Sequence, residues 1–144
     1  MPFGIGVENL KRDVNLGTLL RSAYNFGAAF VFTVGRRYVK QASDTPNTTG
    51  QIPCFRFLDW NDYFSHQPFD WPSVVIERCS NARCLFEAVH PKKAVYLLGP
   101  EDGSVSKEAI ERAALCLTIP SKYNPNVSVA GSIVMYDRLA KEAK

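Results

Sequence analysis

Residues 115–137 constrain the fold more than any other part of the chain. A short apolar run, Leu115 to Ile119, ends at Pro120, and a polar loop rich in asparagine follows it. An apolar pattern then begins at Ser128, and either Ser128 or Asn126 is a suitable N-cap for a helix. This order predicts a buried strand, a loop and a helix. Because α/β proteins place ligand sites in loops at the carboxyl ends of strands, this loop is a candidate site.

The predicted C-terminal helix has its own pattern. Small residues at Ala130 and Gly131 permit close approach of another backbone. Its larger apolar residues fall at helical spacing, and they are Val129, Ile133, Tyr136 and Ala140.

Apolar runs alternate with helix-like patterns along the rest of the chain. Strands are expected at residues 3–7, 28–34, 55–58, 73–77 and 94–98. Expected helix caps are Asn15, Asp59, Ser80 and Ser104 or Ser106, and Gly27 is suited to end the first helix. Residues 36–53 are polar and predict a long surface loop. The alternation predicts an α/β fold with a mainly parallel sheet flanked by helices.

Length and composition indicate one soluble globular domain over residues 1–144, with 46% hydrophobic and 22% charged residues. The net charge of +3 is compatible with a nucleic-acid partner but does not establish one. No apolar run approaches the roughly 20 residues that span a bilayer. The N-terminus lacks the basic head and apolar run of a signal peptide, so a cytoplasmic location is expected.

Cysteines and histidines do not form a ligand-spaced cluster. His66 and His90 lie in polar, turn-like surroundings, which favours surface or capping roles over metal binding or general-base work. The cysteines include no CxxC pair, so structural free thiols are expected in preference to metal or redox roles at Cys54, Cys79, Cys84 and Cys116.

Three segments, in this order, resemble the signature motifs of the SpoU/TrmH branch of the SPOUT RNA methyltransferases. The first begins at Asn15, contains Arg21 and ends at Gly27. The second is Tyr96-Leu-Leu-Gly-Pro-Glu-Asp-Gly-Ser-Val, and the third runs from Ile119-Pro through Asn-Val-Ser-Val-Ala130. Each motif alone is weak, but the three together cover the chain from about Phe3 to Leu139.

The resemblance implies properties that the sequence pattern alone would not predict. The family has a deep trefoil knot at its C-terminus, although true knots are nearly absent from proteins. Its members bind S-adenosylmethionine in the knot and methylate the 2′-hydroxyl of a ribose in tRNA or rRNA, and tRNA is the substrate expected here. They act as homodimers that pack the first and last helices across the interface.

The resemblance also implies which residues form the site. Expected catalytic residues are Asn15, Arg21, Glu101 and Asn126. A guanidinium keeps its proton at pH 7, so Arg21 is expected to hold an RNA phosphate and stabilise a developing alkoxide. The expected cofactor contacts are Leu98, Gly99, Glu101, Gly103, Ile119, Pro120, Val127, Ser128 and Ala130. Taken singly, these residues are equally typical of turns, strand ends and helix caps.

The chain carries no separate RNA-binding domain, so it resembles a minimal form in which the knotted domain must recognise RNA itself. Basic residues supply the candidate phosphate contacts, although charge clusters are often only solvated surface. The candidates are Arg12, Arg36, Arg37 and Lys40.

The third motif departs from the family pattern, which usually has Ser and Leu where this chain has Asn124 and Pro125. Pro125 stiffens the loop, so a knotted RNA-binding protein without catalysis is the alternative. An unrelated nucleotide-binding oxidoreductase is the second alternative. It requires a GxGxxG motif, and the first strand, with Gly4 and Gly6, lacks the third glycine.

Overall fold

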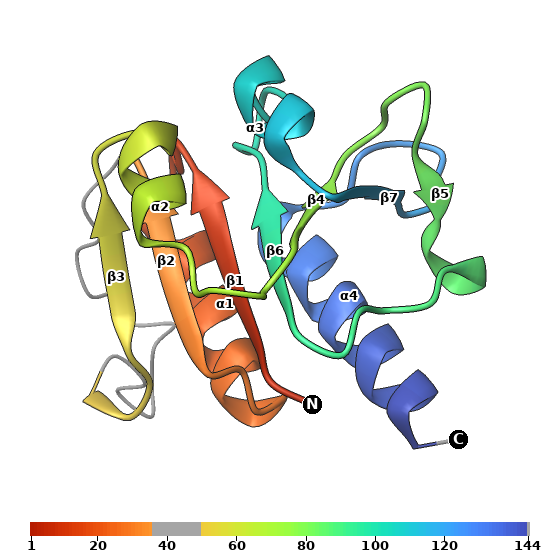
Figure 1. The fold of residues 1–144 in the computed structure, drawn as a ribbon, viewed down its shortest axis with the longest axis horizontal. Helices are drawn as coiled ribbons and strands as arrows, with labels where there is room; N and C mark the ends of the chain where they lie inside the picture. Colours follow the sequence, from red (N-terminus) through yellow and green to blue (C-terminus); the bar gives the residue numbers. More distant parts are fainter. Residues whose placement is uncertain (36–49, 144) are drawn as a thin grey trace.

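The computed structural model describes residues 1–35 and 50–143, so the expectations for Arg36, Arg37 and Lys40 lie outside the described residues. Within that part of the chain, seven strands form one sheet in the order β3-β2-β1-β6-β4-β7-β5, and every pairing between them is parallel (Figure 1). The strands are β1 Phe3–Glu8, β2 Phe30–Val34, β3 Cys54–Phe57, β4 Ser73–Ile76, β5 Arg83–Cys84, β6 Ala94–Leu98 and β7 Leu115–Thr118. The predicted parallel α/β sheet is confirmed.

Helices cover both faces of the sheet. They are α1 Asp13–Asn25, α2 Trp60–His66, α3 Lys107–Arg112 and α4 Val127–Glu142, with a short 3-10 helix η2 at Leu85–Glu87. One core cluster joins the sheet to α1 and α4, and a second cluster on the other face joins it to α2 and α3. The described chain is therefore three layers, with α1 and α4 packed side by side.

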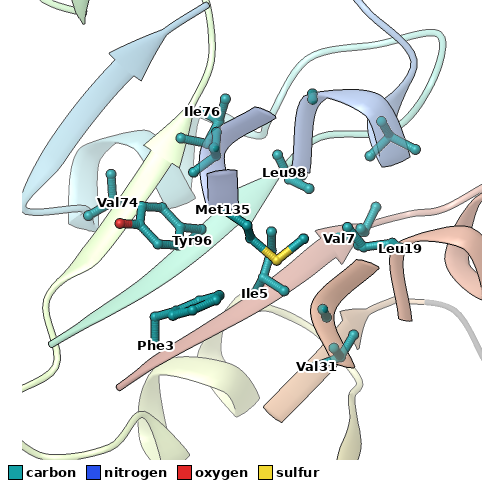
Figure 2. Close-up of a cluster of buried hydrophobic side chains, with 14 of the residues drawn as sticks. Phe3, Ile5, Val7, Leu19, Val31, Val74, Ile76, Tyr96, Leu98 and Met135 are labelled. Atoms are coloured by element: carbon teal, nitrogen blue, oxygen red, sulfur yellow. The ribbon is translucent and has the colours of Figure 1, made fainter. Parts of the chain in front are cut away.

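The core on the α1 and α4 face is aliphatic and aromatic (Figure 2). Ile5 of β1 and Leu98 of β6 lie beside Met135 of α4, and all three are almost completely buried. Gly131 lets α4 approach this closely, because a Cβ atom there would lie 2.4 Å from Leu19 Cδ1 on α1. The small residue predicted to permit close approach therefore does so against α1.

The two glycines of β1 have a steric role. Gly4 pairs with Phe30 and Gly6 with Phe32 on β2. A Cβ atom at either glycine would lie 2.3 Å from the facing phenylalanine ring. These glycines make room for aromatic rings on the α2 and α3 face, which accounts for the pattern without a dinucleotide.

Several predicted helix ends are confirmed. The Asp59 carboxylate accepts from the Asp62 amide at the start of α2, and the Asn126 side chain accepts from the Ser128 amide at the start of α4. Gly27 adopts φ +76° after α1. Its amide and that of Ala28 donate to carbonyls of the last turn, which is a Schellman arrangement.

Two predicted caps are wrong. Helix α1 begins at Asp13, and Asn15 lies inside its first turn with its side chain bonded elsewhere. The helix expected from Ser80 is absent from this described segment. Instead, β5 pairs in parallel with β7 and η2 follows, because Leu85 alone packs into the core while Val89 is 87% exposed.

Helix α4 is present as predicted, but its larger apolar residues do not face the core. Val129, Ile133 and Tyr136 are exposed, and Ala130 and Val134 are buried instead. An exposed apolar stripe on a helix indicates a surface that another molecule covers.

A buried polar network closes the opposite end of the sheet from the polar loop. Arg138 of α4 is fully buried and donates to the carbonyls of Pro91 and Lys92, at 2.9 and 2.8 Å, and to Tyr96 Oη at 3.0 Å. Burial raises the pKa of Tyr96 to about 12, which keeps its hydroxyl protonated. The expected surface role of His90 is wrong, because this ring is buried in the same network.

The His90 ring lies between two partners. Its Nδ1 is 2.6 Å from Tyr96 Oη, and its Nε2 is 2.8 Å from Asp137 Oδ2. A neutral ring with its proton on Nε2 satisfies both contacts, donating to the carboxylate and accepting from the phenol. Burial lowers the pKa of His90 and outweighs the opposing effect of Asp137.

This environment predicts a pH-dependent stability. Because the unfolded chain binds a proton at His90 more readily, the contribution of the neutral ring is complete above its ordinary pKa of 6.5 and is lost as the pH falls through the lower folded value. Melting temperatures measured between pH 7.5 and 5.5 should fall with pH, and His90→Gln should flatten that slope. The exposed His66→Gln serves as the control, and an unchanged slope in His90→Gln would contradict the assignment.

The cysteine expectation holds only in part. Cys79 and Cys116 are joined by a disulfide, so the expected free thiols are wrong at these positions, whereas Cys54 and Cys84 are free. Within residues 1–35 and 50–143, no helix is long and apolar enough to cross a bilayer, and no cluster of potential ligands could hold a metal ion.

Candidate functional site

An open pocket lies at the carboxyl edge of three adjacent strands, β6, β4 and β7. Parallel strands end at the same edge, so their three following turns converge there. The first residues of α4 and the loop before it complete the wall. The lining residues are Ile76, Glu77, Arg78, Leu98, Gly99, Pro100, Glu101, Gly103, Thr118, Ile119, Asn124, Pro125, Val127 and Ala130.

The wall of this pocket combines apolar surface with charge. Aliphatic side chains from all three strand ends and from α4 suit a flat, apolar ring. Two carboxylates, Glu77 and Glu101, and the guanidinium of Arg78 lie among them. The arrangement can hold an amphipathic ligand that carries both a ring system and a positive charge.

Two carboxylates position the turn after β6. Glu77 Oε2 accepts from the Val105 amide at 2.9 Å, and Glu8 Oε2 accepts from the Ser106 amide at 2.8 Å. Gly99 is required in this turn, because a Cβ atom there would lie 2.8 Å from the Val105 nitrogen. The backbone of the turn is therefore held close to the strand ends.

A chain of hydrogen bonds connects the three sequence motifs. Asn15 Nδ2 donates to Glu101 Oε1 at 2.8 Å, and Asn126 Nδ2 donates to Asn15 Oδ1 at 3.0 Å. The Ser128 hydroxyl and amide both donate to Asn126 Oδ1, at 2.6 and 2.9 Å. Residues more than 100 positions apart in sequence thus hold one another in place beside the pocket.

Glu101 is held as a carboxylate. Burial alone would raise the pKa of its side chain, but hydrogen bonds from the Asn15 amide and from the backbone of Lys11 and Arg12 together lower the pKa below its ordinary value. The predicted catalytic residue therefore anchors the start of α1 to the turn after β6.

The loop from β7 to α4 is fastened to the turn after β4. The Arg78 guanidinium donates to the Ser121 carbonyl and, at 3.1 Å, to its hydroxyl. Asn124 and Pro125, which depart from the family pattern, both line the pocket. The departure thus lies in the wall of the site itself.

Most of the predicted cofactor residues lie at this pocket, but Pro120 and Ser128 are not among the described residues that line it. Asn15 and Asn126 act through the hydrogen-bond chain. Arg21 is exposed on α1 and is likewise outside the pocket wall of its own subunit. The functional roles of all these residues stay predictions.

Sequence reasoning missed the residues after β4, namely Ile76, Glu77 and Arg78. These residues are contributed by the strand between β6 and β7. Their signal was the end of a buried strand, but the chain order does not reveal that this strand lies between the other two.

Comparison with known proteins identifies relatives of this fold. A family described as "SpoU rRNA Methylase family" matches residues 2–136, while no curated protein matches the chain. An AdoMet-bound rRNA methyltransferase from Sinorhizobium meliloti has a TM-score of 0.84 at 20% identity, over 97% of this chain and 56% of that one.

Two further structures have the same fold. The SpoU methyltransferase AviRb from Streptomyces viridochromogenes has a TM-score of 0.82 at 17% identity, over 98% of this chain and 60% of its own. The A. aeolicus TrmH/SpoU tRNA modifying enzyme has a TM-score of 0.83 at 18% identity, over 98% of this chain and 77% of its own. This chain spans 56% to 60% of the length of the first structures compared. At these identities the likeness establishes the fold.

Proposed function

Because the chain belongs to the SpoU rRNA methylase family, we propose that it transfers a methyl group from S-adenosylmethionine to a ribose 2′-hydroxyl of RNA. The observation that carries this proposal is the hydrogen-bond chain through Glu101, Asn15, Asn126 and Ser128, which joins all three motifs at one pocket. A substrate RNA suits a cytoplasmic location.

We propose tRNA as the substrate. A structure titled "Structural insights into the 2-OH methylation of C/U34 on tRNA" matches 99% of this chain and 92% of its own, with a TM-score of 0.81 and 16% identity. That relative, like this chain, has little room for a second domain, which supports a tRNA substrate over rRNA.

The pocket residues suit S-adenosylmethionine. The aliphatic wall offers a surface for adenine, and backbone groups at the ends of β6 and β7 are available to its polar edge. Glu77 and Glu101 supply negative charge for a cationic ligand. When bound, the cofactor supplies an electrophilic methyl group on a sulfonium.

The residues of the chain would then position the ribose. Glu101 and Asn126 fix the turns on either side of the pocket through Asn15, so little reorganisation is needed when substrate arrives. Arg21 would hold an RNA phosphate with its planar donors and stabilise negative charge developing on the 2′-oxygen. Positioning and electrostatics supply the acceleration in this scheme.

We propose that the chain works as a homodimer through α1 and α4. A groove between these helices is lined by apolar and small residues, and it continues the exposed stripe of α4. Its residues are Thr18, Phe26, Ser128, Val129, Ser132, Ile133 and Tyr136. An uncovered apolar surface of this kind is typical of a subunit interface.

We also propose that the segment leading into α4 is threaded as a trefoil knot. In support, this segment passes beside the segment that follows β4, and Arg78 bonds to Ser121 where they meet (Figure 1). Arg12 remains the described candidate for an RNA phosphate contact outside the pocket, since it is exposed at the start of α1.

A specific observation favours a second function, RNA binding without catalysis. Asn124 and Pro125, the residues that depart from the family pattern, lie in the pocket wall. A stiffened wall that no longer admits the reacting ribose would leave a binding protein.

One experiment separates the two functions. The protein is incubated with tritiated S-adenosylmethionine and bulk tRNA or rRNA, and the RNA is digested to nucleosides and analysed by mass spectrometry. The proposal requires label in 2′-O-methyl nucleosides, with tRNA labelled in preference to rRNA. Cofactor and RNA binding without transfer would favour the binding protein, and label on bases alone would overturn the ribose assignment.

A further inference from the structure

Tyr123 lies at the mouth of the pocket with its ring exposed. The side chain is 74% exposed, which is unusual for a large aromatic residue next to a ligand site. Its chain neighbours Asn124 and Pro125 line the pocket wall. The ring is therefore within one or two residues of the surface that would hold the methyl donor.

Two cations accompany this ring. Lys122 Nζ lies 5.6 Å from the centre of the Tyr123 ring. Arg78 is exposed in the pocket wall and contacts the loop two residues before Tyr123, at Ser121. An aromatic face beside two positive charges matches the two parts of a nucleotide, its base and its phosphate.

The loop that carries Tyr123 is held at both ends. Arg78 holds Ser121 at one end, and the Asn126 side chain is bonded to Asn15 and Ser128 at the other. Pro125 further restricts the backbone between them. A ring on such a short tethered segment loses little conformational freedom when it stacks on a ligand.

We propose that Tyr123, with Lys122 and Arg78 beside it, stacks on an unpaired base of the RNA next to the ribose that is methylated. This inference rests on the proposed function and adds the substrate class to it, which is a single-stranded or splayed-out segment. Duplex RNA does not offer a base face to a side chain, whereas loops and ends do. Stacking is tolerant of sequence, so Tyr123 would position the nucleotide without reading its identity.

The kinetic test uses three variants of the full chain. Tyr123→Ala should raise the KM for bulk tRNA by about 5- to 100-fold and leave the KM for S-adenosylmethionine unchanged. Tyr123→Phe should stay close to wild type, because the ring is retained. Phe69→Ala removes a 94% exposed ring at the opposite edge of the sheet, before β4, and should change neither constant.

A second measurement works without catalysis. A single-stranded oligonucleotide containing 2-aminopurine should lose fluorescence when it binds the wild type and the Tyr123→Phe variant, because stacking quenches this base. Tyr123→Ala should abolish the quenching, and a duplex carrying the same base should show none with any variant.

The outcomes distinguish this inference from the proposed function. Quenching that depends on the ring, in a protein that transfers no methyl group, would retain the stacking role and refute the enzyme. Methyl transfer with equal quenching in wild type and Tyr123→Ala, or with a KM for tRNA that Tyr123→Ala leaves unchanged, would overturn the stacking role.

Discussion

Replacing Arg21 by alanine is expected to reduce methyl transfer to RNA by at least about 100-fold, the usual effect of removing a donor that stabilises a developing oxyanion. Arg21 lies on the same helix as Asn15, which is bonded to Glu101 at the pocket. Its exposed guanidinium is outside the pocket wall of its own subunit, so it meets the ribose only through the bound RNA or across a dimer. Cofactor affinity should therefore be unchanged.

Two substitutions complete this test. Arg21→Lys keeps the charge but loses the planar pair of donors, so it should recover only part of the activity. Arg56→Ala removes another exposed arginine, on β3, and should act like wild type. Equal losses of transfer and cofactor binding in Arg21→Ala, measured by tritium incorporation and calorimetry, would show that Arg21 supports the fold or the pocket instead.

Replacing Arg138 by methionine is expected to destabilise the protein by about 3–5 kcal/mol, because one partner of a buried ionic network disappears. The loss strands the Pro91 and Lys92 carbonyls and the carboxylate of Glu142, whose Oε1 lies 2.8 Å from Arg138 Nε. The melting temperature in calorimetry should fall on the order of 10 °C.

Helix α3 offers a matched control. Arg112 and Glu108 form the same i, i+4 pair at 3.3 Å, but their side chains are 41% and 49% exposed. Arg112→Met should therefore cost about 1 kcal/mol. Similar melting temperatures for the two variants would mean that the buried network contributes no more than a surface ion pair.

The parallel sheet and most of its elements could be predicted because they depend on local patterns. Continuous apolar runs such as residues 94–98 and caps such as Asp59 and Asn126 act within a few residues. The apolar spacing of α4 located the helix but not its buried face. Small residues face the core there because α1 packs against Gly131, a fact that depends on a partner far away in sequence.

The site could be predicted in part for the same reason. Gly99 and Ile119 follow strands whose carboxyl ends had to meet if the sheet was parallel. Asn15 shows the limit of local reasoning: an asparagine near a helix start is a good cap, but its amide is used by Glu101. Glu77 and Arg78 were missed because strand order, which places β4 between β6 and β7, is not written in the chain.

The central claim, that the turns after β6, β4 and β7 hold the methyl donor, is tested most directly by titrating S-adenosylhomocysteine into the protein in a calorimeter. The wild type should bind one molecule per chain. Ile119→Trp, which places a bulky ring in the pocket wall, should abolish binding without unfolding the protein. Leu58→Trp, at an 85% exposed position before α2, should bind like the wild type. No binding by the wild type, or equal binding by Ile119→Trp, would contradict the account.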